Sequence, residues 1–63
     1  KIPFFIPHDY VPHERERLCL YHRFYALTTR EDVILFLEEL RDRFGLIPDS
    51  IEGALSLVLN LNG

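Results

Sequence analysis

The segment EELRDRFGLIPDSIEG, residues 38–53, constrains the fold more than any other stretch, because one helix must end within it and another must begin. Gly45 suits the left-handed backbone conformation that ends many helices. Pro48 cannot continue a helix. Asp49, with Glu52 three residues later, matches the capping box that starts one. The segment therefore predicts a tight corner between two helices.

The residues before this corner carry the clearest amphipathic pattern of the chain. Thr29, with Asp32 three residues later, has the sequence of another capping box. Apolar residues then follow at helical spacing, at Val33, Phe36, Leu37, Leu40 and Phe44. The pattern predicts a helix over residues 29–44, and we expect Leu46 to fold back onto its last turn.

Two further helices are expected. Residues 13–27 follow Pro12 and carry acidic side chains at their start, which suits a helix N-terminus. They have apolar residues on two faces, which predicts contact with more than one neighbour. A third helix is predicted over residues 49–61. Its apolar face consists of Ile51, Ala54, Leu55 and Val58.

The first twelve residues combine a short apolar run with prolines. KIPFFI, residues 1–6, favours a strand, and Pro3 restricts that strand to a sheet edge. Pro7 and Pro12 enclose an extended connector. The sequence therefore predicts a mainly α chain, with one N-terminal edge strand followed by three short helices. Because a single strand needs a partner, we expect residues 1–63 to be a fragment, the first part of a larger α+β domain.

The composition limits the possible functions. The net charge of -3 argues against a surface that binds nucleic-acid phosphates, which needs clustered Lys and Arg. No apolar run is long enough to span a membrane. Cys19 is the single cysteine, so no disulfide within the chain stabilises it. We expect Cys19 to be a small, buried or half-buried apolar residue in a reducing, intracellular setting.

No motif in the sequence indicates catalysis. Glycine-rich loops that cradle phosphates are missing from the sequence. Cys19 and His22 lie one helical turn apart, but a Cys–His nucleophile also needs an orienting group and an oxyanion site. His8 and His13 do not add the paired spacing of a zinc site. We therefore expect no catalytic residue, metal or cofactor here, with a Cys–His hydrolase as one alternative.

The acidic residues of the second predicted helix form the remaining candidate site. Glu38, Glu39 and Asp42 lie on this helix, with Arg41 and Arg43 among them. Acid–base chemistry would require a shielded pocket that raises a carboxyl pKa. The neighbouring arginines instead favour ion pairs. The cluster is either a solvated ion-pair network or a protein-docking face.

Two blocks of sequence resemble a known family. The first block consists of Ile6-Pro7, Asp9-Tyr10-Val11-Pro12, Arg17-Leu18, Tyr21 and Arg23. The second consists of Glu39-Leu40-Arg41-Asp42-Arg43-Phe44-Gly45, with Pro48 nearby. In content and spacing, they resemble the first part of the C-terminal (TRCF) domain of the bacterial transcription-repair coupling factors. The resemblance extends from about Pro3 to Leu55, which is most of the chain.

The resemblance implies a regulatory domain without catalysis, in a bacterial cytoplasmic protein. The parent protein would be an ATP-driven DNA translocase, whose motor modules bind ATP and Mg²⁺ elsewhere, and which acts on stalled RNA polymerase. The C-terminal domain would pack against the repair-recruiting module of the same protein. It would thereby hide the surface that binds the excision-repair damage-recognition protein.

The same resemblance implies a set of docking residues, and the acidic charge and short apolar runs predict no direct contact with nucleic acid or membrane. Positions Glu39 and Asp42 belong to the helix that the family uses for docking, and Glu38 and Arg43 are their neighbours. The alternative is a small helical DNA-binding module, because three helices with a tight turn can mimic a helix-turn-helix. The carboxylates on the second helix disfavour that alternative.

Overall fold

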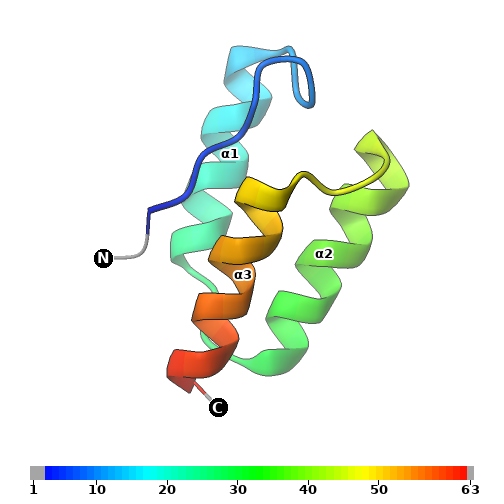
Figure 1. Ribbon diagram of the computed structural model, residues 1–63. Coiled ribbons are helices and arrows are strands. Elements are labelled where there is room, and N and C mark those ends of the chain that lie inside the picture. The colour runs from blue at the N-terminus through cyan, green and yellow to red at the C-terminus, as the bar shows by residue number, and fades with distance from the viewer. Residues whose placement is uncertain (1–2, 63) are drawn as a thin grey trace.

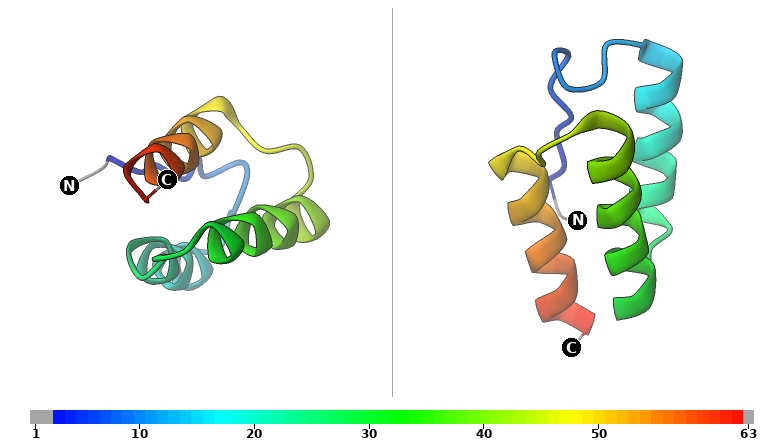
Figure 2. Two further views of the ribbon diagram at one scale, coloured as in Figure 1. Left: turned by 90° about the horizontal axis from the view of Figure 1, so that it is seen from below. Right: turned by 90° about the vertical axis from the view of Figure 1, so that its right-hand side faces the viewer.

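In the computed structural model, which describes residues 3–62, the chain folds into three helices. These are α1 (Glu14–Tyr25), α2 (Arg30–Phe44) and α3 (Asp49–Asn62). Successive helices run in opposite directions (Figure 1). α1 and α2 form one layer, and α3 with the N-terminal segment lies over it (Figure 2). The predicted mainly α fold with three helices is confirmed, although α1 is shorter at both ends than residues 13–27.

The predicted N-terminal edge strand is not found among residues 3–62, and its first two residues, Lys1 and Ile2, lie outside the described part. The segment packs on α1 instead. The Ile6 N–H donates to the Tyr21 hydroxyl at 3.0 Å, and the Phe4 ring stacks on Phe24 with 3.9 Å between centroids. Since α1 engages both the backbone and the side chains, the segment is held without a second strand.

The hydrophobic core lies between the two layers and draws on all parts of the fold. Its fully buried side chains are Ile6, Val11, Leu20, Val33, Phe36, Leu40, Ile51 and Leu55. Burial of each large aliphatic side chain contributes about 1.5–3 kcal/mol. The apolar face expected for α3 is buried, and that of α2 is buried at Val33, Phe36 and Leu40 and partly buried at Leu37 and Phe44. On α1 the core takes Leu20 and Phe24, whereas Leu18 and Tyr25 are exposed, so α1 buries one of its two apolar faces.

The corner between α2 and α3 differs in detail from the expectation. Gly45 has the positive φ that was predicted, 96°, but its ψ of -156° sends the chain away from the helix. Leu46 is therefore 82% exposed and does not fold back, and Ile47 packs against the core in its place. Asp49 is the first residue of α3 and not its cap, because the Pro48 carbonyl accepts from the Glu52 N–H at 3.0 Å.

The other end of α2 matches the sequence pattern. The Asp32 N–H donates to the Thr29 Oγ1 at 3.1 Å, as expected for a capping residue. This bond satisfies one of the N–H groups that a helix start leaves unpaired. Among the described residues, no helix is long and apolar enough to cross a membrane.

Tyr10 fastens the N-terminal segment to the last turn of α2. Its ring packs against Phe44, with 5.7 Å between centroids. Its hydroxyl lies 2.9 Å from the Gly45 carbonyl oxygen and 3.2 Å from that of Leu40, so its single proton is shared between these two acceptors. Burial raises the pKa of Tyr10. The C-terminal turn of α2, which carries Asp42 and Arg43, is thus held by a contact from a distant part of the sequence.

Candidate docking surface on α2

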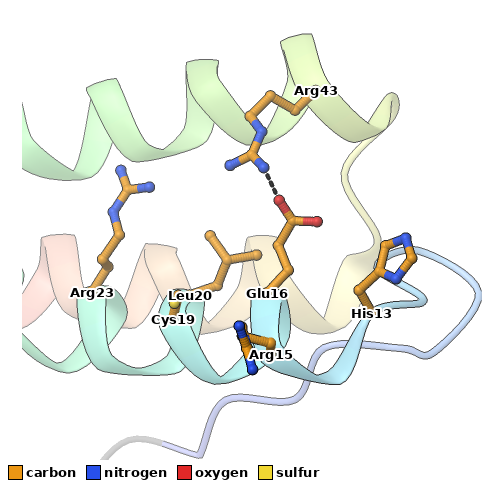
Figure 3. Close-up of a pocket in the computed structure, with 7 residues that line it drawn as sticks. All are labelled: His13, Arg15, Glu16, Cys19, Leu20, Arg23 and Arg43. Atoms are coloured by element: carbon orange, nitrogen blue, oxygen red, sulfur yellow. Dashed lines mark ion pairs between the residues drawn. The ribbon is translucent and has the colours of Figure 1, made fainter.

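Four charged side chains connect α1 to α2 in a continuous series of ion pairs, the seam network: Glu16, Arg23, Glu39 and Arg43. Arg23 holds Glu39 with two hydrogen bonds, Nη2 to Oε1 and Nη1 to Oε2, both 2.7 Å. Arg43 donates from Nη1 to the Glu39 Oε2 at 3.1 Å. Arg43 also pairs with Glu16 across the seam (Figure 3). The two guanidinium groups are therefore matched by two carboxylates.

These contacts change the titration of the groups. The hydrogen bonds from Arg23 lower the pKa of Glu39, against a smaller opposing effect of burial. The same bonds raise the pKa of Arg23. Each guanidinium also lies over an aromatic ring, Arg23 over Phe36 at 5.2 Å and Arg43 over Phe44 at 4.8 Å. Glu39 and Arg43, both predicted as interaction residues, are thus already engaged within the chain.

The seam network is open to water, which limits its energy. All four side chains are partly exposed. Exposed ion pairs contribute about 0.2–1 kcal/mol each, and salt screens them. The bidentate geometry at Arg23 places that pair toward the upper end of this range. The network therefore orients α1 relative to α2, while the apolar core supplies most of the stability.

The side of α2 that faces away from the core carries a second row, the outer stripe: Glu31, Leu35, Glu38 and Asp42. Their spacing of four, three and four residues places them along one line of the helix. All four side chains are exposed. Within residues 3–62, Glu38 and Asp42 make no hydrogen bond or ion pair. The structure therefore divides the predicted interaction residues, with Glu38 and Asp42 available to a partner.

Cys19 and His22 of α1 do not open to the same groove. Cys19 is exposed, contrary to the expectation, because the core takes only a narrow face of α1. It opens to a groove of about 540 Å³ between α1 and α2 (Figure 3). His22 opens to a separate groove of about 290 Å³ with Leu18, Tyr21 and Tyr25. Residues 3–62 contain no group of three side chains placed to hold a metal ion.

Two contacts that build the surface were not found from the sequence. Tyr10 was noted only as a motif residue, yet its hydroxyl fixes the end of α2. Arg23 was likewise only a motif residue, yet it is the main partner of Glu39. Tyrosine and arginine at the spacing of the family motif indicate residues with a role in the domain. The motif does not specify which carbonyl the tyrosine donates to or which carboxylate the arginine pairs with.

The family comparison and the search for similar proteins identify the same family. The TRCF domain family matches residues 1–60. The transcription-repair-coupling factor of Myxococcus xanthus is 36% identical over 58 residues, or 92% of this chain. Those of Escherichia coli and Haemophilus influenzae are each 33% identical over 57 residues, or 90% of it. The matched region is 5% of the length of each of these relatives. No solved structure matches the chain.

Proposed function

Because this chain belongs to the TRCF domain family, we propose that it is a non-catalytic regulatory domain of a transcription-repair coupling factor and docks on that protein's repair-recruiting module. In the docked state it covers the surface that binds the excision-repair damage-recognition protein. Engagement of the ATP-driven motor with DNA and stalled RNA polymerase releases it. This role belongs to transcription-coupled DNA repair in the bacterial cytoplasm.

The observation that carries this proposal is the row of unpaired carboxylates on α2, which lies within the residues that match the TRCF domain family. Glu38 and Asp42 project from α2 without partners inside the described chain, and Glu31 extends the row. Carboxylates at the rim of an interface fix its register and select basic partners, but each adds little affinity. A weak polar rim suits a contact that must open during every repair event.

The ion pairs within the chain support a narrower choice of docking residues among those predicted. Glu39 is shared between Arg23 and Arg43, so a partner would have to displace one of these arginines to reach it. Glu38 and Asp42 require no such exchange. We therefore assign docking to Glu38 and Asp42 first, and assign Glu39 and Arg43 to holding α2 in place. Binding of α2 in a DNA groove is disfavoured, because the outer stripe would place carboxylates against phosphates.

The proposal is tested by reversing both charges, Glu38→Lys with Asp42→Lys, in the full-length coupling factor that carries this domain. Repulsion from basic residues of the partner should open the docked state. Affinity for the damage-recognition protein, measured by isothermal titration calorimetry, should rise by roughly tenfold, the equivalent of about 1.4 kcal/mol. Glu52→Lys is the matched control, since Glu52 is exposed on a different helix.

Removal of the whole domain sets the upper limit of the same assay. The domain-deleted protein should bind the damage-recognition protein at least as tightly as the doubly reversed variant. If deletion leaves the affinity at the wild-type value, the domain does not cover that surface and the proposed function is wrong. If deletion raises the affinity but the double reversal does not, the domain docks through a different face.

A further inference from the structure

We propose that Ile34 and Leu35 form the apolar centre of the docking surface, and that the partner presents an apolar socket bordered by lysine and arginine side chains. This inference rests on the proposed function and specifies its partner. Together with the outer stripe, Ile34 completes a surface that we call the α2 docking surface. It consists of Glu31, Ile34, Leu35, Glu38 and Asp42.

Exposure is the first observation behind this inference. Leu35 is 63% exposed and Ile34 is 44% exposed, although both are on a helix that buries Val33, Phe36 and Leu40 almost completely. A single exposed leucine is common in soluble proteins. Two adjacent large aliphatic side chains on the solvent side of one helix provide a compact apolar area, of the kind that supplies most of the energy at a protein interface.

The second observation is the charge around Leu35, which indicates the kind of partner surface that would bind there. Glu31 lies four residues before Leu35 and Glu38 three residues after it, so a carboxylate stands on each side of the leucine along the stripe. Asp42 continues the line one turn further. The basic residues of the seam network face α1 and are occupied by carboxylates. The exposed Arg41 lies three residues after Glu38, toward the Ile34 side, but the positions on either side of Leu35 along the stripe are carboxylates. The border of Leu35 is therefore negative, and a complementary partner is positive.

Other occupants fit this surface less well. A second copy of the chain, meeting it through the same face, would bring the carboxylates of both copies together, which is unfavourable. An anionic membrane surface or a nucleic acid would be repelled by the same groups. An apolar socket with a basic border satisfies both features at once: it buries Leu35 and pairs Glu38 and Asp42.

The inference is tested with Leu35→Ser in the full-length coupling factor, with Leu46→Ser as the matched control. Leu46 is 82% exposed but lies in the α2–α3 corner, beyond the end of α2. Loss of the apolar centre should weaken docking and raise the affinity for the damage-recognition protein by roughly tenfold, because a few central residues supply most of the binding energy at an interface. Leu46→Ser should leave the affinity unchanged.

Salt dependence separates the apolar centre from its charged border. Leu35→Ser weakens docking without removing the charged side chains, so the docking that remains in this variant should keep the wild-type dependence on salt. In the double variant Glu38→Gln with Asp42→Asn, the affinity should depend less on salt, because the charge pairs that salt screens are no longer present. A Leu35→Ser effect that disappears at high salt would contradict an apolar role for this side chain.

The outcomes distinguish the two proposals. If deletion of the domain leaves the affinity unchanged, both the proposed function and the assigned occupant are wrong. If deletion raises the affinity while Leu35→Ser behaves like Leu46→Ser, the domain docks but Leu35 is not the centre of its surface. Circular dichroism of Leu35→Ser should match that of the wild type, since an exposed side chain is lost and no core contact is removed.

Discussion

Glu38 and Glu39 are consecutive residues of the same type, yet the structure places them in different regions of the molecule. Glu39 faces α1 and is held by Arg23 and Arg43 in the seam network. Glu38 faces solvent in the outer stripe and has no partner within residues 3–62. Each step along a helix turns the side chain by about 100°, which is enough to separate an internal contact from an external one.

The comparison shows how to interpret an acidic cluster on a helix. The five carboxylates of α2 are not one surface, because Glu39 neutralises arginines of the same chain. Only those with no internal partner contribute net negative charge to a docking contact. The seam network and the outer stripe therefore predict opposite responses to substitution, in stability for the first and in binding for the second.

The largest difference in stability is expected between substitutions of two leucines of α2, one in the core and one in the outer stripe. Leu40→Ala should lower the free energy of unfolding by about 2–5 kcal/mol, because Leu40 is fully buried. Leu35→Ala should change it by no more than about 0.5 kcal/mol. Urea unfolding followed by circular dichroism measures both. Equal losses would show that Leu35 packs against the fold.

Tyr10→Phe should lower the free energy of unfolding by about 1 kcal/mol, because the carbonyls of Leu40 and Gly45 lose their donor. The raised pKa of Tyr10 adds a pH test. A raised pKa means that its stabilising effect is complete below about pH 10 and is lost as the pH rises through the folded-state value. The difference between wild type and Tyr10→Phe should therefore shrink in alkali.

Glu39→Gln should cost about 0.2–1 kcal/mol at neutral pH and low salt, through loss of the ion pairs with Arg23 and Arg43. Because the pKa of Glu39 is lowered in the folded state, its contribution is present above about pH 4.3 and is lost as the pH falls through the folded value. Acid titration of stability should show the two proteins converging at low pH. A constant gap would mean that Glu39 acts by packing and not by charge.

The smallest effect on stability is expected for Glu38→Gln, within about 0.5 kcal/mol, because the side chain has no partner to lose. Parallel urea unfolding of Glu38→Gln and Glu39→Gln measures both effects. A loss as large as that of Glu39→Gln would show that the outer stripe contributes to the fold.

Local features of the fold could be predicted from the sequence, whereas long-range contacts could not. The helices and the Thr29 cap follow from nearby residues, and the structure confirms them. The prediction of an edge strand was wrong. A strand needs a neighbouring strand, which local sequence does not specify, and in this fold the Ile6 N–H donates to the Tyr21 hydroxyl on α1 instead. The corner was predicted at Gly45, but its ψ decides where Leu46 points, and no sequence pattern gives ψ.

The candidate site shows the same division. The sequence identified the acidic helix, and the structure shows that its carboxylates have two environments. Arg23 lies sixteen residues from Glu39, so their pairing depends on how α1 packs on α2. The exposure of Cys19 also depends on this packing, because the sequence offers two apolar faces on α1 and only one is buried.

Asp42 and Arg43 provide the most direct measurement, since they are adjacent in the sequence but belong to the outer stripe and to the seam network. The affinity of the full-length coupling factor for the damage-recognition protein should be compared in Asp42→Asn and Arg43→Gln. We expect a severalfold increase for Asp42→Asn, and no increase for Arg43→Gln, which leaves Glu39 with less neutralising charge. An equal increase in both, or an increase in Arg43→Gln alone, would contradict the division of α2 into a structural and a docking side.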